Sequence, residues 1–318
     1  MADAQINRQI WLVSRPQGEA SVSNFRLVET PLAPLQDGEV RVRNHYLSLD
    51  PYMRGRMDDA KSYAAPQPLN EVMIGGTVGV VTESRNPAFK TGDSVVGVLG
   101  WQEYGTSDGR GLNKVDTSQV PLSAYLGALG MPGVTAWYGL NGIIEPKAGE
   151  TVVVSAASGA VGIAGGAEKC RYVVETLGFD ACVDYKAGKL YEDLKAATPN
   201  GVDGYFENVG GEVLNAVLAR MNAFGRVAVC GMISGYDGKP LPMDAPRLIL
   251  TQRLKLQGFI VYEHLDIWPQ ALKELSERVV SKKLHFRESI AEGLENAPEA
   301  FLGLLRGKNF GKQLVKLV

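Results

Sequence analysis

The chain has 318 residues, a length that allows two domains with ample cores. Apolar residues make up 45% of it and charged residues 21%, a composition typical of a soluble globular enzyme. The net charge of −2, with no block of like charges, argues against a nucleic-acid or membrane-surface partner.

Short β-rich runs separated by turn residues make up the first part of the chain, among them "IWLVSRP", "FRLVET", "EVRVRNHYLSL" and "DSVVGVLGW". Val40 and Val42 alternate with Arg41 and Arg43, the period of a half-buried strand. We predict an antiparallel, partly open β-barrel over residues 1–125. The final "GKQLVKLV" reads as a strand that returns to it, so residues 288–318 join this domain.

From residue 126 to 287 predicted strands alternate with loops and helices. "TVVVSA" is short, continuous and β-branched, as a buried strand is, and "AEKCRYVVETLG" has helical spacing with Gly178 as its C-terminal cap. "ACVDY", "DGYFENV", "RVAVCGM" and "LKLQGFIVY" read as strands, and "GEVLNAVLARMNAFG" and "WPQALKELSERVVSKKL" as helices. This alternation predicts the α/β class, a doubly wound parallel sheet covered on both faces.

The stretch "SAASGAVGIAGGAEKC" follows the strand "TVVVSA" and raises the question of a phosphate site. A strand that opens into a glycine turn and a helix places backbone N–H groups at a pyrophosphate. Gly159 and Gly162 form the second half of such a motif, with Ala157 at its first glycine position. Glycine turns after strands are common, so the motif alone also fits an ordinary turn, but its position at the head of the α/β half favours phosphate binding.

Several stretches in the same order resemble one family: "LSLDPYMRGRM", "GMPGVTAWYGL", "VVVSAASGAVG", "LGFDACVDYK", "YFENVGGEVL", "LQGFIVYEH" and "GKNFGKQLVK". From about residue 8 to the C-terminus the chain resembles the zinc-independent medium-chain dehydrogenase/reductases, in the branch of prostaglandin reductases, plant double-bond reductases and bacterial curcumin reductase. The resemblance implies a Rossmann cofactor domain and a GroES-like substrate domain. It also implies NADP(H), reduction of a carbon–carbon double bond conjugated to a carbonyl of a small enal or enone, and a homodimer.

The resemblance also implies the cofactor-binding residues. Gly159, Ala160, Val161 and Gly162 would contact the pyrophosphate, and Lys169 and Tyr185 would hold the adenosine 2′-phosphate. The ribose and nicotinamide would be lined by Asn208, by Cys230, Gly231, Met232, Ile233, Ser234, Gly235 and Tyr236, by Phe259, Ile260 and Val261, and by Asn309. A lysine supplies point charge for a phosphate. Taken without the family, Lys169 also fits a solvated lysine, and Asn208 fits a turn residue.

Metal chemistry is not expected. Cys170, Cys182 and Cys230 form no C-x-x-C pair, and the histidines (His45, His264 and His285) are isolated. Together with the absence of an evident signal peptide or membrane span, the cysteine usage favours a cytoplasmic protein.

Reduction of an enone requires hydrogen-bond donors for the enolate oxygen and a proton for the α-carbon. The candidates are Tyr52 in "DPYMR", Tyr236 in "CGMISGY" and Tyr262 in "FIVYEH", with Tyr52 or Tyr262 preferred. Each also fits a half-buried tyrosine that only packs its ring. Two rival functions stay open: a quinone reductase of the same fold, and a non-enzymatic protein with a damaged cofactor site.

The glycine turn is followed by too little chain. A dinucleotide-binding unit places a helix and a second strand after the turn, with the ribose-reading residue about 20 residues on. Here only "IAGGAE" separates Gly162 from Lys169, so we expect the first crossover helix and the second strand to be missing. Either a segment is omitted, or it is truly deleted, or the chain is re-threaded with "ACVDY" as second strand and Asp184 near a ribose hydroxyl, which would favour NADH. We favour omission of about 15 to 20 residues, since deletion would strip a central strand of its neighbour.

Overall fold

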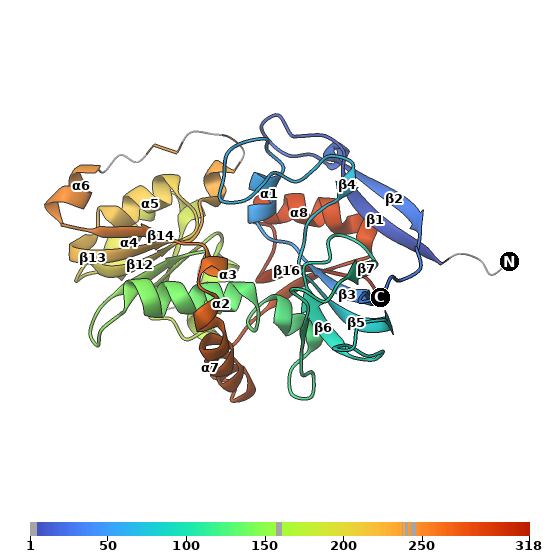
Figure 1. The fold of residues 1–318 in the computed structure, drawn as a ribbon. Helices are drawn as coiled ribbons and strands as arrows, with labels where there is room; N and C mark the ends of the chain where they lie inside the picture. The colour runs from blue at the N-terminus through green and yellow to red at the C-terminus, as the bar shows by residue number, and fades with distance from the viewer. Residues whose placement is uncertain (1–4, 157–160, 237, 239–240, 243–245) are drawn as a thin grey trace. The chain divides into compact units, whose positions relative to one another are not determined.

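The computed structural model describes residues 5–156, 161–236, 238, 241–242 and 246–318, and it divides into two compact units. The first unit comprises Met1–Gly130 with Phe286–Val318, and the second Met131–His285. From sequence we placed these boundaries a few residues away, after residues 125 and 287. Figure 1 shows the elements coloured by their position along the chain.

The first unit is mainly antiparallel β-structure. Its elements are β1 (Ile6–Leu12), β2 (Phe25–Pro31), β3 (Val40–Ser48), α1 (Tyr52–Arg56), β4 (Glu71–Val72), β5 (Thr77–Ser84), β6 (Ser94–Gly97), β7 (Tyr104–Ser107), β8 (Asn113–Lys114), β15 (Glu288–Glu292), α8 (Ala297–Leu305) and β16 (Lys312–Lys316).

Strand β3 organises this unit. Within the described residues, the larger sheet runs β15-β16-β3-β5-β6-β8, and a smaller one runs β2-β1-β4. One edge of β3 pairs with β5, while its other edge pairs with β7 over its first residues and with β16 over its last. The C-terminal strand therefore returns to this domain, as predicted. The core behind the sheet contains Trp101, which is fully buried and stacks on Phe25 at 5.4 Å between ring centroids.

The second unit alternates strands and helices. Its elements are α2 (Met131–Tyr138), β9 (Val152–Ser155), β10 (Val161–Ala164), α3 (Ala167–Glu175), β11 (Ala181–Asp184), α4 (Leu190–Ala197), β12 (Val202–Glu207), α5 (Gly211–Leu218), β13 (Met221–Val229), α6 (Pro246–Thr251), β14 (Lys255–Gly258) and α7 (Trp268–Val280).

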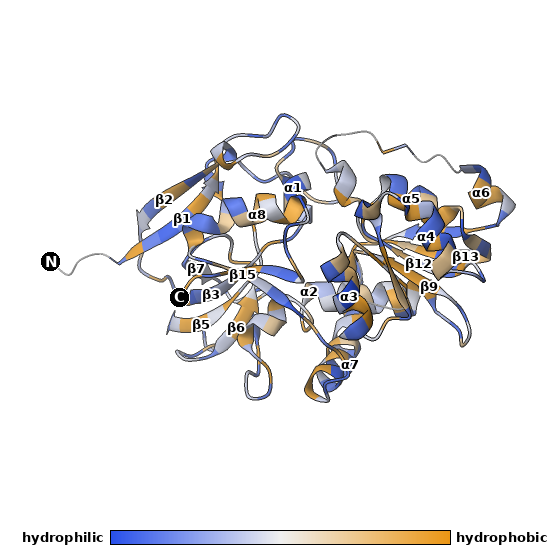
Figure 2. Ribbon diagram, turned by 180° about the vertical axis from the view of Figure 1, so that it is seen from behind, coloured by the Kyte–Doolittle hydropathy of each residue, from blue (hydrophilic) through white to orange (hydrophobic). Residues whose placement is uncertain are grey.

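The strands of the second unit form a parallel sheet in the order β11-β10-β9-β12-β13-β14 across the described residues. The order reverses between β9 and β12, the arrangement of a Rossmann fold, which the sequence predicted. Figure 2 shows β9 coloured mainly as hydrophobic, as a strand covered on both faces must be. One predicted helix is shorter than expected. Residues 221–225 of "GEVLNAVLARMNAFG" begin β13, where sheet pairing overrides helical propensity.

Strand β10 corrects the prediction that the second strand is missing. Its residues Val161–Ala164 are buried and pair with β9 on one side and with β11 on the other. Small and apolar side chains suit a strand covered on both faces, so "VGIA" serves as the second strand. The re-threaded arrangement is also wrong, because β11 lies beside β10 and not beside β9. Since β9 has neighbours on both edges, a deletion would not leave it unpaired.

The connection from β9 to β10 is unusually short. Only residues 156–160 join them, and residues 157–160 lie outside the described part of the chain. Parallel strands are normally joined by a dozen or more residues that include a helix. Five residues are too few for a crossover helix of ordinary length.

Candidate cofactor site

The carboxyl ends of β10 and β11 bring together two predicted cofactor residues, Lys169 and Tyr185. The Asp184 carboxylate accepts hydrogen bonds from the backbone N–H of Gly166 at 2.7 Å and of Lys186 at 3.0 Å, which ties the start of α3 to the end of β11. A Cβ on Gly165 would lie 2.8 Å from the Tyr185 ring, so the ring packs directly on that glycine. Ligands of open α/β sheets bind at this edge.

Two lysines repel each other at this edge. Burial lowers the pKa of Lys169, and the positive charge of Lys186 lowers it further, while Glu168 opposes both effects. The Lys186 ammonium lies 5.8 Å from the centre of the Tyr185 ring. A bound phosphate would relieve the repulsion between the two ammonium groups and accept charge-assisted hydrogen bonds from them. The position therefore suits an anionic group of a nucleotide.

Asn208 lies at the topological switch point, between the ends of β9 and β12. Its backbone N–H donates to Ser155 Oγ at 2.9 Å, and its Nδ2 donates to the Ser155 carbonyl at 2.7 Å. The crevice at this point is where dinucleotides bind in Rossmann folds. Asn208 therefore lies at this crevice, and its role as a cofactor-lining residue stays a prediction.

Glu207, which the sequence analysis missed, holds this region together. Its side chain is fully buried and accepts hydrogen bonds from the Tyr205 hydroxyl at 2.7 Å, from Ser155 Oγ at 3.2 Å and from the backbone N–H of Gly210 at 2.9 Å. The N–H of Val209 donates to the same carboxylate. The sequence carried a signal for it, since an acidic residue stands at the end of an apolar strand. A carboxylate buried there needs hydrogen-bond partners.

The predicted segment from Cys230 to Tyr236 lies against the turn after β12. The backbone N–H of Cys230 donates to the Glu207 carbonyl at 2.9 Å, and that of Ile233 donates to the Asn208 carbonyl at 3.1 Å. Burial, and then the negative charge of Glu207, raises the pKa of the Cys230 thiol to about 12, so it stays protonated. A Cβ on Gly231 would lie 3.5 Å from the Tyr236 hydroxyl, which places that hydroxyl beside the switch point.

Phe259, Ile260 and Val261 follow β14. Phe259 and Val261 are buried, and the Phe259 ring lies 5.5 Å from that of Tyr138. Tyr262 is 54% exposed and stacks on Trp268 at 5.4 Å between ring centroids.

Two predicted residues belong to the first unit. Tyr52 begins α1 and packs against the hydrophobic core of that unit. Asn309 donates from Nδ2 to the Gly311 carbonyl at 2.7 Å. Arg54 of α1 is buried and forms an ion pair with Asp58 at 2.7 Å.

The glycine turn is the part of the predicted site that the structure changes. Gly159 and Ala160 lie outside the described residues. Val161 and Gly162 do not lie in a turn, because they pair within β10 with Val153 and Val154 of β9. Their predicted position was wrong because "VGIA" pairs as a strand between β9 and β11.

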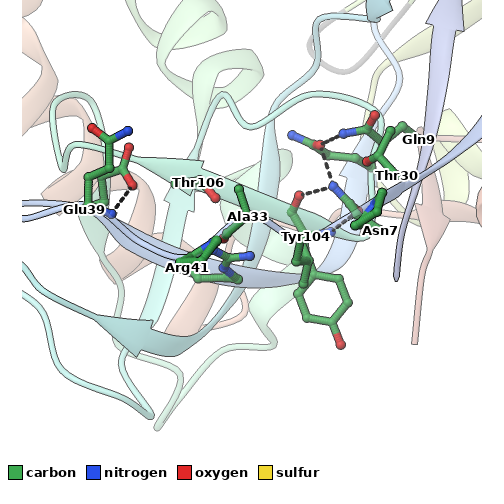
Figure 3. Close-up of a pocket in the computed structure, with 13 residues that line it drawn as sticks. Asn7, Gln9, Thr30, Ala33, Glu39, Arg41, Tyr104 and Thr106 are labelled. Atoms are coloured by element: carbon green, nitrogen blue, oxygen red, sulfur yellow. Dashed lines mark hydrogen bonds between the residues drawn. The ribbon is translucent and has the colours of Figure 1, made fainter. Parts of the chain in front are cut away.

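A cavity of about 350 Å³ lies elsewhere, in the first unit, and none of the predicted site residues lines it (Figure 3). Its lining includes Asn7, Gln9, Arg41 and Tyr104. Across the described residues there is no group of three or more His, Cys, Asp or Glu side chains that could hold a metal ion. In that same part of the chain, every helix is too short or too polar to cross a membrane.

Comparison with known proteins identifies the family. Residues 8–115 match the model described as the N-terminal domain of oxidoreductase, and residues 152–277 match the one described as zinc-binding dehydrogenase. The chain is 46% identical to the NADPH-dependent curcumin reductase of Escherichia coli, over 98% of this chain and 97% of that protein. The chain therefore belongs to the medium-chain dehydrogenase/reductases, in their zinc-independent branch.

Two other comparisons place it within that branch. It is 38% identical to an NADP⁺-dependent 2-alkenal reductase of Nicotiana tabacum, over 99% of this chain and 98% of that protein. A crystal structure of CurA from Vibrio vulnificus in complex with NADPH has a TM-score of 0.93 and 43% identity, over 98% of this chain and 99% of that one. The alignment with the curcumin reductase runs over 338 positions against 318 residues here, so at least 20 of them have no residue in this chain.

Proposed function

We propose that this protein is an NADPH-dependent reductase of the carbon–carbon double bond in α,β-unsaturated aldehydes and ketones. The observation that carries the proposal is near full-length similarity to an NADPH-dependent curcumin reductase and to an NADP⁺-dependent 2-alkenal reductase. The substrates are small molecules, the protein is a medium-chain enzyme, and no step of the reaction requires a metal ion.

The residues at the carboxyl ends of β10 and β11 suit NADPH. Lys169 and Lys186 supply two positive charges beside Tyr185, a set of groups that fits a 2′-phosphate. Asn208 and the segment from Cys230 to Tyr236 would line the ribose and nicotinamide at the switch point. The nicotinamide, when bound, supplies a hydride to the β-carbon of the substrate.

The pyrophosphate is the part of the cofactor for which this chain offers the least evident binding groups. A helix N-terminus normally binds it, and the connection between β9 and β10 has no room for that helix. Contacts from Gly159, Ala160, Val161 and Gly162 stay predictions, and the strand pairing of Gly162 weighs against its own contact.

A tyrosine hydroxyl would stabilise the enolate or protonate the α-carbon. A hydroxyl within hydrogen-bond reach of the carbonyl oxygen stabilises the negative charge that develops there, and a hydroxyl or water delivers the proton to the α-carbon. Tyr52, Tyr236 and Tyr262 remain the candidates. Of the two on the second unit, Tyr236 has its hydroxyl beside Gly231 at the switch point, whereas Tyr262 is held by stacking on Trp268.

The test is product analysis with NADPH deuterated at the transferred position of nicotinamide C4. We expect the saturated ketone or aldehyde, with deuterium on the β-carbon and the carbonyl intact. An allylic alcohol, or activity abolished by chelators, would contradict the proposal.

A quinone reductase of the same fold is the second candidate. The Escherichia coli quinone oxidoreductase complexed with NADPH has a TM-score of 0.78 but only 17% identity, which supports the shared fold alone. Turnover of an enone and of a quinone under the same conditions separates the two functions. If a folded chain oxidised NADPH with neither acceptor, the non-enzymatic alternative would stand.

We further propose that the protein forms a homodimer, on the basis of the family resemblance. We also propose that it is located in the cytoplasm, on the basis of its cysteine usage. Sedimentation of the purified protein would decide the oligomeric state, and fractionation of cells the location.

A further inference from the structure

Two of the three cysteines face each other across the contact between α3 and β11. The Sγ atoms of Cys170 and Cys182 are 2.8 Å apart, and both cysteines are free thiols of intermediate burial. Cys170 lies in α3 and Cys182 in β11, the elements that flank the loop of residues 176–180. Cys230 follows β13 and packs with a different hydrophobic cluster, so it takes no part in this pair.

The pair is close to the geometry of a disulfide. A disulfide bond has an S–S distance of about 2.03–2.05 Å, so the two sulfurs need to approach by less than about 1 Å. The elements that carry them are packed side by side along their length.

We propose that Cys170 and Cys182 are a dithiol that a hydroperoxide oxidises to an intramolecular disulfide. The bond would join α3 to β11 at the carboxyl edge of the sheet. Lys169 and Tyr185 lie close to it in sequence.

The hydrogen bond between the thiols gives the two sulfurs different roles. Cys182 donates its S–H to Cys170 Sγ, which favours the thiolate at Cys170. Burial raises the pKa of both thiols, and the negative charge of Asp184 adds to this. The hydrogen bond between the two thiols lowers the pKa of Cys170 and raises that of Cys182, whereas the Ala164 backbone lowers the pKa of both. Cys170 is therefore the attacking thiol and Cys182 the resolving one, and the raised pKa makes the reaction slow at neutral pH.

The chemistry balances in two steps. The Cys170 thiolate attacks the terminal oxygen of the hydroperoxide, the O–O bond breaks, and the alcohol or water leaves after taking up a proton. The sulfur is oxidised by two electrons to a sulfenic acid. The Cys182 sulfur then attacks the sulfenic sulfur, the S–S bond forms, the S–O bond breaks, and water leaves with the Cys182 proton.

The disulfide would act on the cofactor site, a consequence that rests on the proposed function. Lys169 directly precedes Cys170, and Tyr185 lies three residues after Cys182. Drawing α3 and β11 together shifts both groups relative to the 2′-phosphate. We expect the dissociation constant for NADPH to rise about three- to tenfold on oxidation, and that for NADH to change less.

The decisive experiment uses the full chain treated with hydrogen peroxide, followed by mass spectrometry. We expect the wild-type protein to lose two hydrogen atoms, a peptide map to join Cys170 to Cys182, and dithiothreitol to reverse the change. Cys230→Ser, the matched control, should lose the two hydrogens as the wild type does. Cys170→Ser and Cys182→Ser should not, and their melting temperatures show whether they are folded.

Three results would overturn the dithiol: no loss of hydrogen in the wild type, a bond that involves Cys230, or sulfinic acid in place of the disulfide. Titrating NADPH and NADH into reduced and oxidised protein tests the consequence. Equal affinity before and after oxidation would overturn the effect on the cofactor. Failure of the reduced protein to bind NADPH would contradict the proposed function instead, while the mass measurement still decides the dithiol.

Discussion

Asn208 is fastened to Ser155 by two hydrogen bonds, from its backbone N–H to Oγ at 2.9 Å and from its Nδ2 to the Ser155 carbonyl at 2.7 Å. These bonds join the ends of β9 and β12 at the point where the strand order reverses. Because Ser155 Oγ also donates to the buried Glu207 carboxylate, one network sets the position of the turn that would meet the nicotinamide end of the cofactor.

Lys169→Ala should weaken NADPH binding about ten- to a hundredfold and NADH binding far less. The reason is the loss of a charge-assisted hydrogen bond of roughly 1.5 to 3 kcal/mol to the 2′-phosphate. Fluorescence titration with both cofactors measures it. Lys195→Ala, an exposed lysine of α4, is the control and should change neither affinity. Equal losses for the two cofactors in the Lys169 variant would count against the assignment.

Tyrosine-to-phenylalanine variants should identify the proton donor. Each change keeps the ring and removes only the hydroxyl, so packing is preserved at Tyr52, Tyr236 and Tyr262. The variant of the true donor should lose about 10²- to 10⁴-fold in kcat with little change in KM for NADPH. The other two should stay close to the wild type. Three unaffected variants would point to water as the donor.

Glu207→Ala should strongly destabilise the second unit. The change leaves the Tyr205 hydroxyl, Ser155 Oγ and the backbone N–H of Gly210 without their buried acceptor. We expect a loss of about 3 kcal/mol or more in the free energy of unfolding, measured in urea. Glu212→Ala, at an exposed glutamate of α5, should change it by less than about 0.5 kcal/mol. Similar small losses in both variants would show that the network contributes little.

The ion pair of Glu150 with Arg226 should make stability depend on acid pH. The two side chains are about four-fifths buried and meet through two hydrogen bonds, at 2.5 and 3.1 Å. The hydrogen bond from Arg226 lowers the pKa of Glu150 below its ordinary value of 4.5. The stabilisation is therefore complete above pH 4.5 and is lost as the pH falls below it.

Urea unfolding of the wild type and of Glu150→Gln, over a pH series from about 3 to 7, measures this dependence. The two proteins should differ most at neutral pH and converge in acid. A difference that stays constant across the series would refute the assignment.

The short connection between β9 and β10 leads to a prediction about the intact protein. From the spacing we expect about 15 to 20 further residues after Gly162, and the longer alignments with relatives agree with a gap in this chain. The mass of the protein purified from its natural source should then exceed 34.3 kDa. A mass of 34.3 kDa would refute omission, and the shorter chain should then bind the pyrophosphate weakly for want of a helix N-terminus.

The sequence by itself determined the two fold classes and the family. A short apolar run such as "TVVVSA" is typical of a strand in a covered parallel sheet, and the alternation around Val40 and Val42 indicated a strand. The expected exposed face is wrong at Arg41, which is buried. These patterns are local, so they are readable without coordinates. The family motifs then indicated Lys169, Tyr185 and Asn208 as cofactor residues.

Only the tertiary structure decided how residues distant in sequence meet. "VGIA" reads equally well as the end of a glycine turn or as a strand, and pairing with both β9 and β11 settles that it is β10. The partners of Glu207 come from two strands and a turn, and Cys170 meets Cys182 because α3 folds back on β11. Such contacts depend on chain reversal and packing, which no local pattern encodes.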